Sequence, residues 1–234
     1  MKTLAFLITL AALGANPGAA WAKGPVVVEL FTAQGCASCK AANAMVAKMA
    51  DRPGVLALTW PVDYWDYLGW KDTFAQPEFT ARQKAFGRRL GPRDVYTPQV
   101  VVGGGAQASG DDAKGVETLI ANAAKTKTHP PKVRVSAAGV VHVGSGRSPH
   151  VAADVWLVRY DPGVRTVEIT GGDNRGTVVT LRNVAREVVR LGAWRGARVT
   201  LKGPPATEKG LFTAVIVEGA RGGPIIAAAK ARGR

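Results

Sequence analysis

Short apolar runs alternate with amphipathic segments through the first half of the chain. Residues 25–31 and 55–62 are continuous apolar runs rich in β-branched side chains, and they predict two buried strands. Between them, residues 38–50 repeat apolar positions at helical spacing, and residues 51–54 (Asp-Arg-Pro-Gly) end that predicted helix.

The same alternation continues as far as residue 124. A proline at position 77 sits where a first-turn proline belongs and opens a predicted helix that ends before Gly91. A third strand follows at 99–102, three glycines permit a tight hairpin, and the chain returns at 106–109 before a last helix at 111–124. The predicted order is β-α-β-α-β-β-α.

Beyond residue 131 the apolar period changes to two. The predicted strands there lie at residues 133–136, 140–143, 151–160, 164–169, 178–181, 197–201, 212–218 and 225–229. Residues 184–191 fit a helix or a strand equally well. Gly, Pro and Asp separate the runs at the spacing of a sandwich, so we predict a small antiparallel, β-sandwich-like domain.

The N-terminus has the pattern of a secretory signal peptide. Lys2 precedes an apolar run at 4–13, and Ala20-Trp21-Ala22 places small residues at both positions that a cleavage site requires. We predict a signal peptide at 1–22, cleavage near its end, and a periplasmic or secreted protein. The alternative is an uncleaved anchor, but residues 14–17 interrupt the run, which is shorter than the roughly 20 residues of a membrane span.

The mature chain then divides into two predicted domains. An α/β domain covers residues 23–126, a linker of Lys, Thr, His and Pro covers 127–131, and a β-rich domain covers 132–234. No transmembrane segment is expected in the mature chain.

Composition excludes several classes of protein. With 234 residues, 47% of them hydrophobic and 21% charged, the chain is globular rather than disordered, collagenous or coiled-coil. It has only 2 cysteines, which excludes a disulfide-stapled miniprotein and a four-thiolate zinc module.

The net charge of +14 is concentrated in the second half, where residues 130–234 carry 17 Lys and Arg against 7 Asp and Glu. Outside the cytoplasm, an anionic envelope surface is the partner that such a basic domain would meet. The arginines are nevertheless scattered singly, without a polybasic block or interleaved aromatics, so we expect a solvated surface and no nucleic-acid partner. The arginines in question are Arg159, Arg165, Arg175, Arg182, Arg186, Arg190, Arg195 and Arg198.

The motif that could carry out a reaction is Cys36-Ala-Ser-Cys39, between a predicted strand and the start of a helix. The free N–H groups and positive dipole end of the helix favour a thiolate at Cys36, and Lys40 adds positive charge. Ser38 is placed to hydrogen-bond that sulfur. We predict Cys36 as the nucleophile and Cys39 as the resolving thiol, which attacks a mixed disulfide formed at Cys36.

A second motif, residues 95–99 (Val-Tyr-Thr-Pro-Gln), places a proline at the entry of the third strand. With the CxxC, it makes the first domain similar to the thioredoxin superfamily, in which a Thr-Pro or Val-Pro with a cis bond faces the cysteines and helps to present the substrate backbone. The resemblance implies these roles for Thr97 and Pro98. It also implies an acidic residue behind the disulfide, for which Glu29 is the counterpart: either a proton relay for the dithiol or a carboxylate satisfied by its neighbours.

The whole mature chain resembles a family of secreted bacterial proteins known as a domain of unknown function with a thioredoxin-like fold. The resemblance rests on residues 29–36, 62–72 and 95–99, and it extends to 154–158 and 172–176. It implies a thioredoxin-like α/β domain and a redox-type site without naming a substrate.

Two positions depart from the thioredoxin pattern. Gly35 stands where thioredoxins usually carry an aromatic residue, and Lys40-Ala-Ala42 replaces a proline-rich helix start. Both thiols are kept, but the redox potential and the choice of partner are left open.

An aromatic segment, residues 63–70 (Asp-Tyr-Trp-Asp-Tyr-Leu-Gly-Trp), follows the second strand. It is either a hydrophobic plug or a wall of the active-site cleft, because loops at this edge of the sheet lie near the cysteines. We assign Tyr64, Trp65 and Trp70, together with Thr97, to substrate binding. Residues 172–176 read as a turn to which we assign no function.

These observations predict an exported thiol–disulfide oxidoreductase that acts on protein or small-molecule thiols and disulfides and needs no cofactor. One alternative is a thioredoxin-like binding module of the cell envelope with an inert disulfide. Another is a carrier of a soft metal ion such as Cu(I) on the two thiolates; the histidines have no ligand-like spacing, and no closed metal site is expected.

Overall fold

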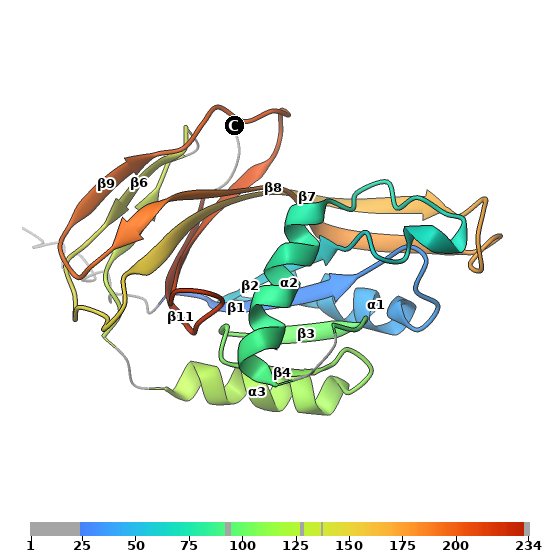
Figure 1. Ribbon diagram of the computed structural model, residues 1–234, viewed down its shortest axis with the longest axis horizontal. Helices are drawn as coiled ribbons and strands as arrows, with labels where there is room; N and C mark the ends of the chain where they lie inside the picture. The colour runs from blue at the N-terminus through green and yellow to red at the C-terminus, as the bar shows by residue number, and fades with distance from the viewer. Residues whose placement is uncertain (1–23, 92–94, 127–128, 137, 232–234) are drawn as a thin grey trace, which may run out of the picture.

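A computed structural model describes residues 24–91, 95–126, 129–136 and 138–231 and shows a mixed α/β protein with two sheets (Figure 1). The helices are α1 (Cys39–Met49), α2 (Pro77–Leu90), α3 (Ala113–Lys125) and a short 3-10 helix η1 (Asp66–Leu68). The strands are β1 (Val26–Thr32), β2 (Val55–Pro61), β3 (Gln99–Val102), β4 (Ala106–Ser109), β5 (Val133–Val135), β6 (Val140–Val143), β7 (Ala153–Glu168), β8 (Val178–Trp194), β9 (Val199–Lys202), β10 (Phe212–Glu218) and β11 (Ile225–Ala231). The predicted signal peptide lies outside the described residues.

The first half of the chain has the predicted order of strands and helices. Its strands lie in the order β2-β1-β3-β4, with β1 and β2 parallel and β3 and β4 antiparallel to their neighbours. The continuous apolar runs are explained by burial on both faces: β2 is buried along its whole length, and only Val26 of β1 is partly exposed.

Helices cover both faces of this part of the sheet. On one face, α1 and α3 pack through Val46, Val116 and Ile120 against the even-numbered residues of β1. On the other face, α2 packs through Phe79 and Phe86 against a cluster that also contains both cysteines. Cys36 follows shortly after the carboxyl end of β1, which ends at Thr32.

The second half contains a long hairpin, β7–β8, that runs across the molecule (Figure 1). The prediction of two strands at 151–160 and 164–169 is wrong, because both belong to β7. Pro162 interrupts the apolar pattern but not the strand: it lies in an irregularity between Asp161 and Val164, where the pairing of β7 with β8 shifts register, and beyond Tyr160, where the pairing with β10 ends. The ambiguous segment 184–191 is part of β8.

β8 also connects the two halves of the chain. It pairs in parallel with β2 at Thr59 and Val184, and the sheet continues through β7 and β10 to β11. The result is one eight-stranded sheet, in the order β11-β10-β7-β8-β2-β1-β3-β4. The two predicted domains thus share a sheet, while their boundaries stay a prediction.

A second sheet, β5-β6-β9, faces the end of the large sheet that β7, β10 and β11 form. Buried side chains from both sheets, among them Val141, Leu157, Trp194 and Val215, fill the space between them. This is the face-to-face packing of a sandwich. Within the part of the chain that the structure describes, no helix is long and apolar enough to cross a lipid bilayer.

Candidate functional site: the Cys36–Cys39 disulfide

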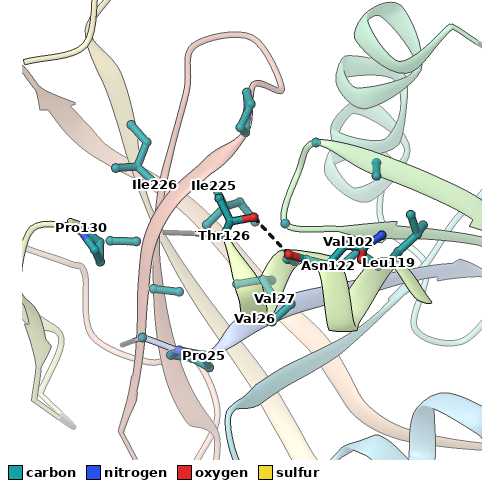
Figure 2. A pocket seen from close by; sticks show the side chains of 18 residues that line it. Pro25, Val26, Val27, Val102, Leu119, Asn122, Thr126, Pro130, Ile225 and Ile226 are labelled. Carbon is teal, nitrogen blue, oxygen red and sulfur yellow. Dashed lines mark hydrogen bonds between the residues drawn. The ribbon is translucent and has the colours of Figure 1, made fainter. Parts of the chain in front are cut away.

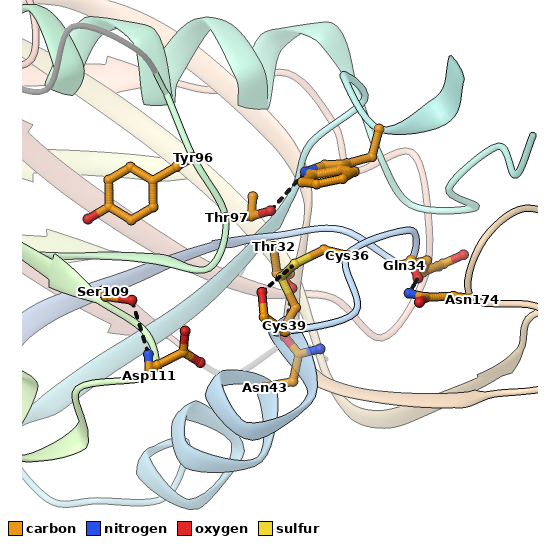
Figure 3. Close-up of a disulfide and its surroundings, with 12 residues drawn as sticks. Thr32, Gln34, Cys36, Cys39, Asn43, Tyr96, Thr97, Ser109, Asp111 and Asn174 are labelled. Carbon is orange, nitrogen blue, oxygen red and sulfur yellow. Dashed lines mark hydrogen bonds between the residues drawn. A yellow bond between two sulfur atoms is a disulfide. The ribbon is translucent and has the colours of Figure 1, made fainter. Parts of the chain in front are cut away.

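Cys36 and Cys39 form a disulfide at the start of α1, with their Cα atoms 5.4 Å apart (Figure 3). The first turn of α1 has no acidic residue, so no side chain there offsets the positive end of the helix dipole. The Ser38 hydroxyl lies 3.6 Å from Sγ of Cys36, within the range of a hydrogen bond to sulfur. The role of Cys36 as the nucleophile stays a prediction.

The Thr97–Pro98 segment lies against the helix that carries the cysteines. Its peptide bond is cis, and the carbonyl of Pro98 accepts a 2.8 Å hydrogen bond from the amide of Gly110. A Cβ added to Gly110 would lie 2.7 Å from the Cβ atoms of both Ala42 and Pro98. The glycine therefore permits Pro98 to pack close to α1, one turn beyond Cys39.

Trp65 joins the Thr97 segment to the turn before Cys36. Its indole N–H donates a 2.8 Å hydrogen bond to the hydroxyl of Thr97, drawn as a dashed line in Figure 3. A Cβ added to Gly35 would lie 3.4 Å from the Cβ of Trp65, an ordinary van der Waals distance, so Trp65 lies directly against the backbone of this turn. Trp65 and Tyr64 both pack against the cluster that contains the cysteines.

Tyr64 carries a buried phenol whose oxygen has no hydrogen-bond partner among the described residues. Burial raises the pKa of its hydroxyl to about 12, although the nearby polar side chains of Gln83, Thr97 and Trp65 act in the opposite direction. The phenol therefore keeps its proton beside Thr97.

Trp70, the third predicted aromatic residue, contacts the turn from a different side. Its indole N–H donates a 2.8 Å hydrogen bond to Oε1 of Gln34, and the Nε2 of Gln34 donates a 2.8 Å bond to the hydroxyl of Thr73. The segment between β2 and α2, residues 62–76, thus holds the turn before Cys36 through Gln34; we call it the β2–α2 loop.

A buried carboxylate, Asp72, fixes the same turn. Oδ2 accepts a 2.7 Å bond from the amide of Gln34, and Oδ1 accepts bonds from the amides of Phe74 and Ala75. Burial raises the pKa of Asp72 to about 6, and the nearby charge of Asp66 adds to the rise, while the three amides lower it. The carboxylate form is therefore held by backbone donors at neutral pH.

Glu29 is fully buried and ion-paired. The guanidinium of Arg82 donates to its two oxygens over 2.7 and 3.1 Å, and to Glu218 of β10 over 2.7 Å. Arg82 also lies over the rings of Trp60 and Phe86. Of the two alternatives for Glu29, the structure shows the carboxylate satisfied by a neighbour; a relay role stays a prediction.

Several residues of this site were not identified from the sequence. Gln34 and Asp72 lie within the segments 29–36 and 62–72 that carry the family resemblance, but no role was predicted for either residue. Residues 172–176 were predicted to form a turn without a function. Asn174, in that turn, donates a 2.8 Å hydrogen bond to the backbone carbonyl of Gln34. The partners are 140 residues apart, and no local pattern indicates such a contact.

A cavity of about 480 Å³ lies away from the disulfide (Figure 2). Its lining is mostly apolar and includes Val26, Val102, Leu119 and Ile225. Val26 begins β1, whereas the cysteines follow the other end of that strand, so the cavity is not part of the site. Among the described residues, no group of three or more His, Cys, Asp or Glu side chains is arranged to hold a metal ion.

The basic second half carries fewer unpaired charges than its composition indicates. Five of the eight named arginines form ion pairs, each with one carboxylate: Arg159 with Glu187, Arg165 with Asp161, Arg182 with Asp51, Arg186 with Glu208 and Arg190 with Asp154. An anionic envelope surface as a partner stays a prediction.

Comparison with known proteins gives a family and a fold. A protein from Agrobacterium tumefaciens of known crystal structure is 32% identical over 92% of this chain and 97% of its own, with a TM-score of 0.75. HBP35 of Porphyromonas gingivalis, at 14% identity over 90% of this chain and 76% of its own and a TM-score of 0.60, shares the fold. A search of curated proteins found no match. Residues 27–218 match the family described as "Protein of unknown function (DUF1223)", and the chain belongs to that family.

Proposed function

We propose that this protein is an exported thiol–disulfide oxidoreductase whose first half is thioredoxin-like. The strand order β2-β1-β3-β4, with α1 and α3 on one face and α2 on the other, supports the proposed fold. The observation that carries the proposal is the Cys36–Cys39 disulfide at the start of α1, with Pro98 packed against the same helix.

The proposed exchange needs only the two thiols and the substrate. The Cys36 thiolate attacks one sulfur of a substrate disulfide, which forms a mixed disulfide and releases the other substrate sulfur as a thiolate. The Cys39 thiolate then attacks Sγ of Cys36, releases the second substrate thiolate and closes the Cys36–Cys39 disulfide. Two electrons pass from the protein to the substrate, and the reverse sequence oxidises a substrate dithiol.

The surrounding residues have supporting roles in this proposal. Thr97 and Pro98 present the backbone of the substrate beside the cysteines. Trp65 lies against Gly35, the position at which thioredoxins usually carry an aromatic residue. Tyr64 and Trp70 complete the wall around the turn.

The test is catalysed exchange with a protein disulfide, using purified protein and the variants Cys36→Ala and Cys39→Ala. We expect Cys36→Ala to abolish exchange. We expect Cys39→Ala to accumulate mixed disulfides at Cys36, detected by mass spectrometry, because the resolving thiol is absent. Exchange that persists in Cys36→Ala would contradict the proposal.

One observation favours a second function, a binding module with an inert disulfide. Cys36 and Cys39 are only 4% and 1% exposed, so a partner reaches the sulfurs only if the wall around them moves. This alternative predicts that a double Cys→Ala variant folds and retains its partner, and that the wild-type disulfide resists exchange.

A further inference from the structure

Gln34 lies within the turn that leads into Cys36. The turn is closed by a 3.2 Å bond from the amide of Cys36 to the carbonyl of Ala33. The amide and both side-chain polar atoms of Gln34 bond to the β2–α2 loop, and its backbone carbonyl accepts the bond from Asn174. Because Gln34 is fully buried, water cannot replace a lost donor without rearrangement.

Asn174 belongs to the tip of the β7–β8 hairpin, residues 169–177. Hydrogen bonds within this tip stabilise its conformation. The amide of Ile169 donates to Thr177, and the amide of Gly176 donates back to Ile169 over 2.7 Å. The hydroxyl of Thr177 donates a 2.7 Å bond to the carbonyl of Asn174. These bonds hold Asn174 in place, and its side chain is buried against Gln34, as Figure 3 shows.

The hairpin tip also touches the β2–α2 loop through its backbone. A Cβ added to Gly172 would lie 2.7 Å from the carbonyl oxygen of Leu68, and one added to Gly171 would lie 2.8 Å from that of Gly69. Trp70 and other side chains of the loop pack on a small apolar cluster of the hairpin. Two glycines in the tip thus permit a contact that larger residues would prevent.

We propose that Asn174 is a positioning residue for the dithiol: it holds the turn at Gln34 and thereby helps to set the equilibrium between the Cys36–Cys39 disulfide and its reduced form. This inference rests on the proposed function and gives the second half of the chain a part in the site.

The direction of the effect follows from the chemistry of the exchange. The disulfide reacts with two glutathione molecules to give the protein dithiol and glutathione disulfide, with two electrons and two protons passing to the protein. Closing the ring again is intramolecular, so it is favoured when the fold holds the two sulfurs close together. A looser turn at Gln34 lets Cys36 move away from Cys39 and shifts the equilibrium toward the dithiol.

The experiment compares two aspartate variants of buried asparagines. Asn174→Asp removes the donor to Gln34, and Asn183→Asp removes an equivalent 2.8 Å donor to the carbonyl of Ala57 in β2. Both changes place a carboxylate against a backbone carbonyl, and only one concerns the cysteine turn. Each protein is equilibrated in glutathione buffers and in dithiothreitol buffers, trapped by alkylation and counted by mass.

We expect Asn174→Asp to lower the equilibrium constant for disulfide formation about fivefold, the change that a typical hydrogen bond of about 1 kcal/mol gives. We expect Asn183→Asp to leave the constant unchanged while lowering stability. An unchanged constant in Asn174→Asp, or equal changes in both variants, would overturn the inference. Asn174→Ala replaces the aspartate variant if that protein does not fold.

The two proposals fail in different ways in this experiment. A wild-type disulfide that glutathione leaves intact and only dithiothreitol reduces would contradict the proposed function. The comparison of the asparagine variants is still made in dithiothreitol, and it tests the positioning role separately.

Discussion

The indole of Trp65 is hydrogen-bonded to the hydroxyl of Thr97 over 2.8 Å, which closes the β2–α2 loop over the turn before Cys36. Because Trp65 packs on Gly35 and on the cluster containing the cysteines, we infer that it limits access to the disulfide. Trp65→Phe should lower the free energy of unfolding by about 1 kcal/mol through the lost bond. The same substitution should also speed reduction of the disulfide by dithiothreitol. Alkylation at successive times and mass spectrometry measure that rate.

A matched change elsewhere separates access from general weakening. Trp194→Phe removes an indole bond of 3.1 Å to the carbonyl of Gly144, in the sheet-to-sheet packing of the second half. Reduction in that variant should proceed at the wild-type rate. Equal rates in all three proteins would show that Trp65 does not cover the sulfurs.

Gly110 is required for the close packing of Pro98 on α1. Gly110→Ala places a Cβ 2.7 Å from the Cβ atoms of Ala42 and Pro98, so we expect a loss of about 1–3 kcal/mol, typical of overpacking. In Gly87→Ala, within α2, the new Cβ is 3.7 Å from Val95, and alanine favours the helix, so stability should be kept or raised. Urea unfolding measures both changes; a Gly110→Ala protein as stable as wild type would show that this segment can move.

Arg82 compensates two buried carboxylates at once. Arg82→Met leaves Glu29 and Glu218 without their cation, and we expect a loss of about 3–5 kcal/mol in the free energy of unfolding. Arg52→Met breaks an exposed pair with Glu117 and should change stability by less than about 1 kcal/mol. Similar effects of the two substitutions would contradict a structural role for the buried cluster.

The Glu218 carboxyl predicts a pH dependence of stability. Burial raises its pKa from 4.5 to about 7; Arg82 opposes this rise, and the charges of Glu29 and Asp154 add to it. The folded state therefore binds the proton more tightly than the unfolded state does. The resulting stabilisation of the folded state is complete below about pH 4.5 and is lost as the pH rises through 7.

Unfolding free energies of wild type and Glu218→Gln, measured across this range, test that sign. The wild type should lose stability relative to the variant as the pH rises from 4.5 to 7. Glu208→Gln, at an exposed pair with Arg186, is the control and should differ little from wild type throughout. A wild type that becomes more stable relative to Glu218→Gln as the pH rises would contradict the raised pKa of Glu218.

Local sequence patterns were sufficient for the first half of the fold. The continuous apolar runs at β1 and β2 and the helical spacing at α1 depend on neighbouring residues, and they correctly place Cys36 just before a helix. The long strand β7 was divided in the prediction because Asp161, Pro162 and Gly163 have the composition of a turn, whereas the structure accommodates them as an irregularity in the pairing of β7 with β8.

The parts of the site that were missed are contacts between distant segments. Asn174 reads as a turn residue by its own neighbours, and only the pairing of β8 with β2 brings its hairpin to Gln34. The same holds for Arg82, whose two carboxylates come from β1 and β10. Composition predicts a basic surface in the second half, but it does not show that Arg159 and its neighbours are already paired.

The most direct test of the account is the reduction potential of the Cys36–Cys39 pair in the purified wild-type protein. Buffers of known thiol–disulfide ratio, alkylation and mass spectrometry give the midpoint. We predict a value within the range of exchange proteins, about −120 to −270 mV. A disulfide that stays closed below about −300 mV would identify a structural bond and contradict the proposed oxidoreductase.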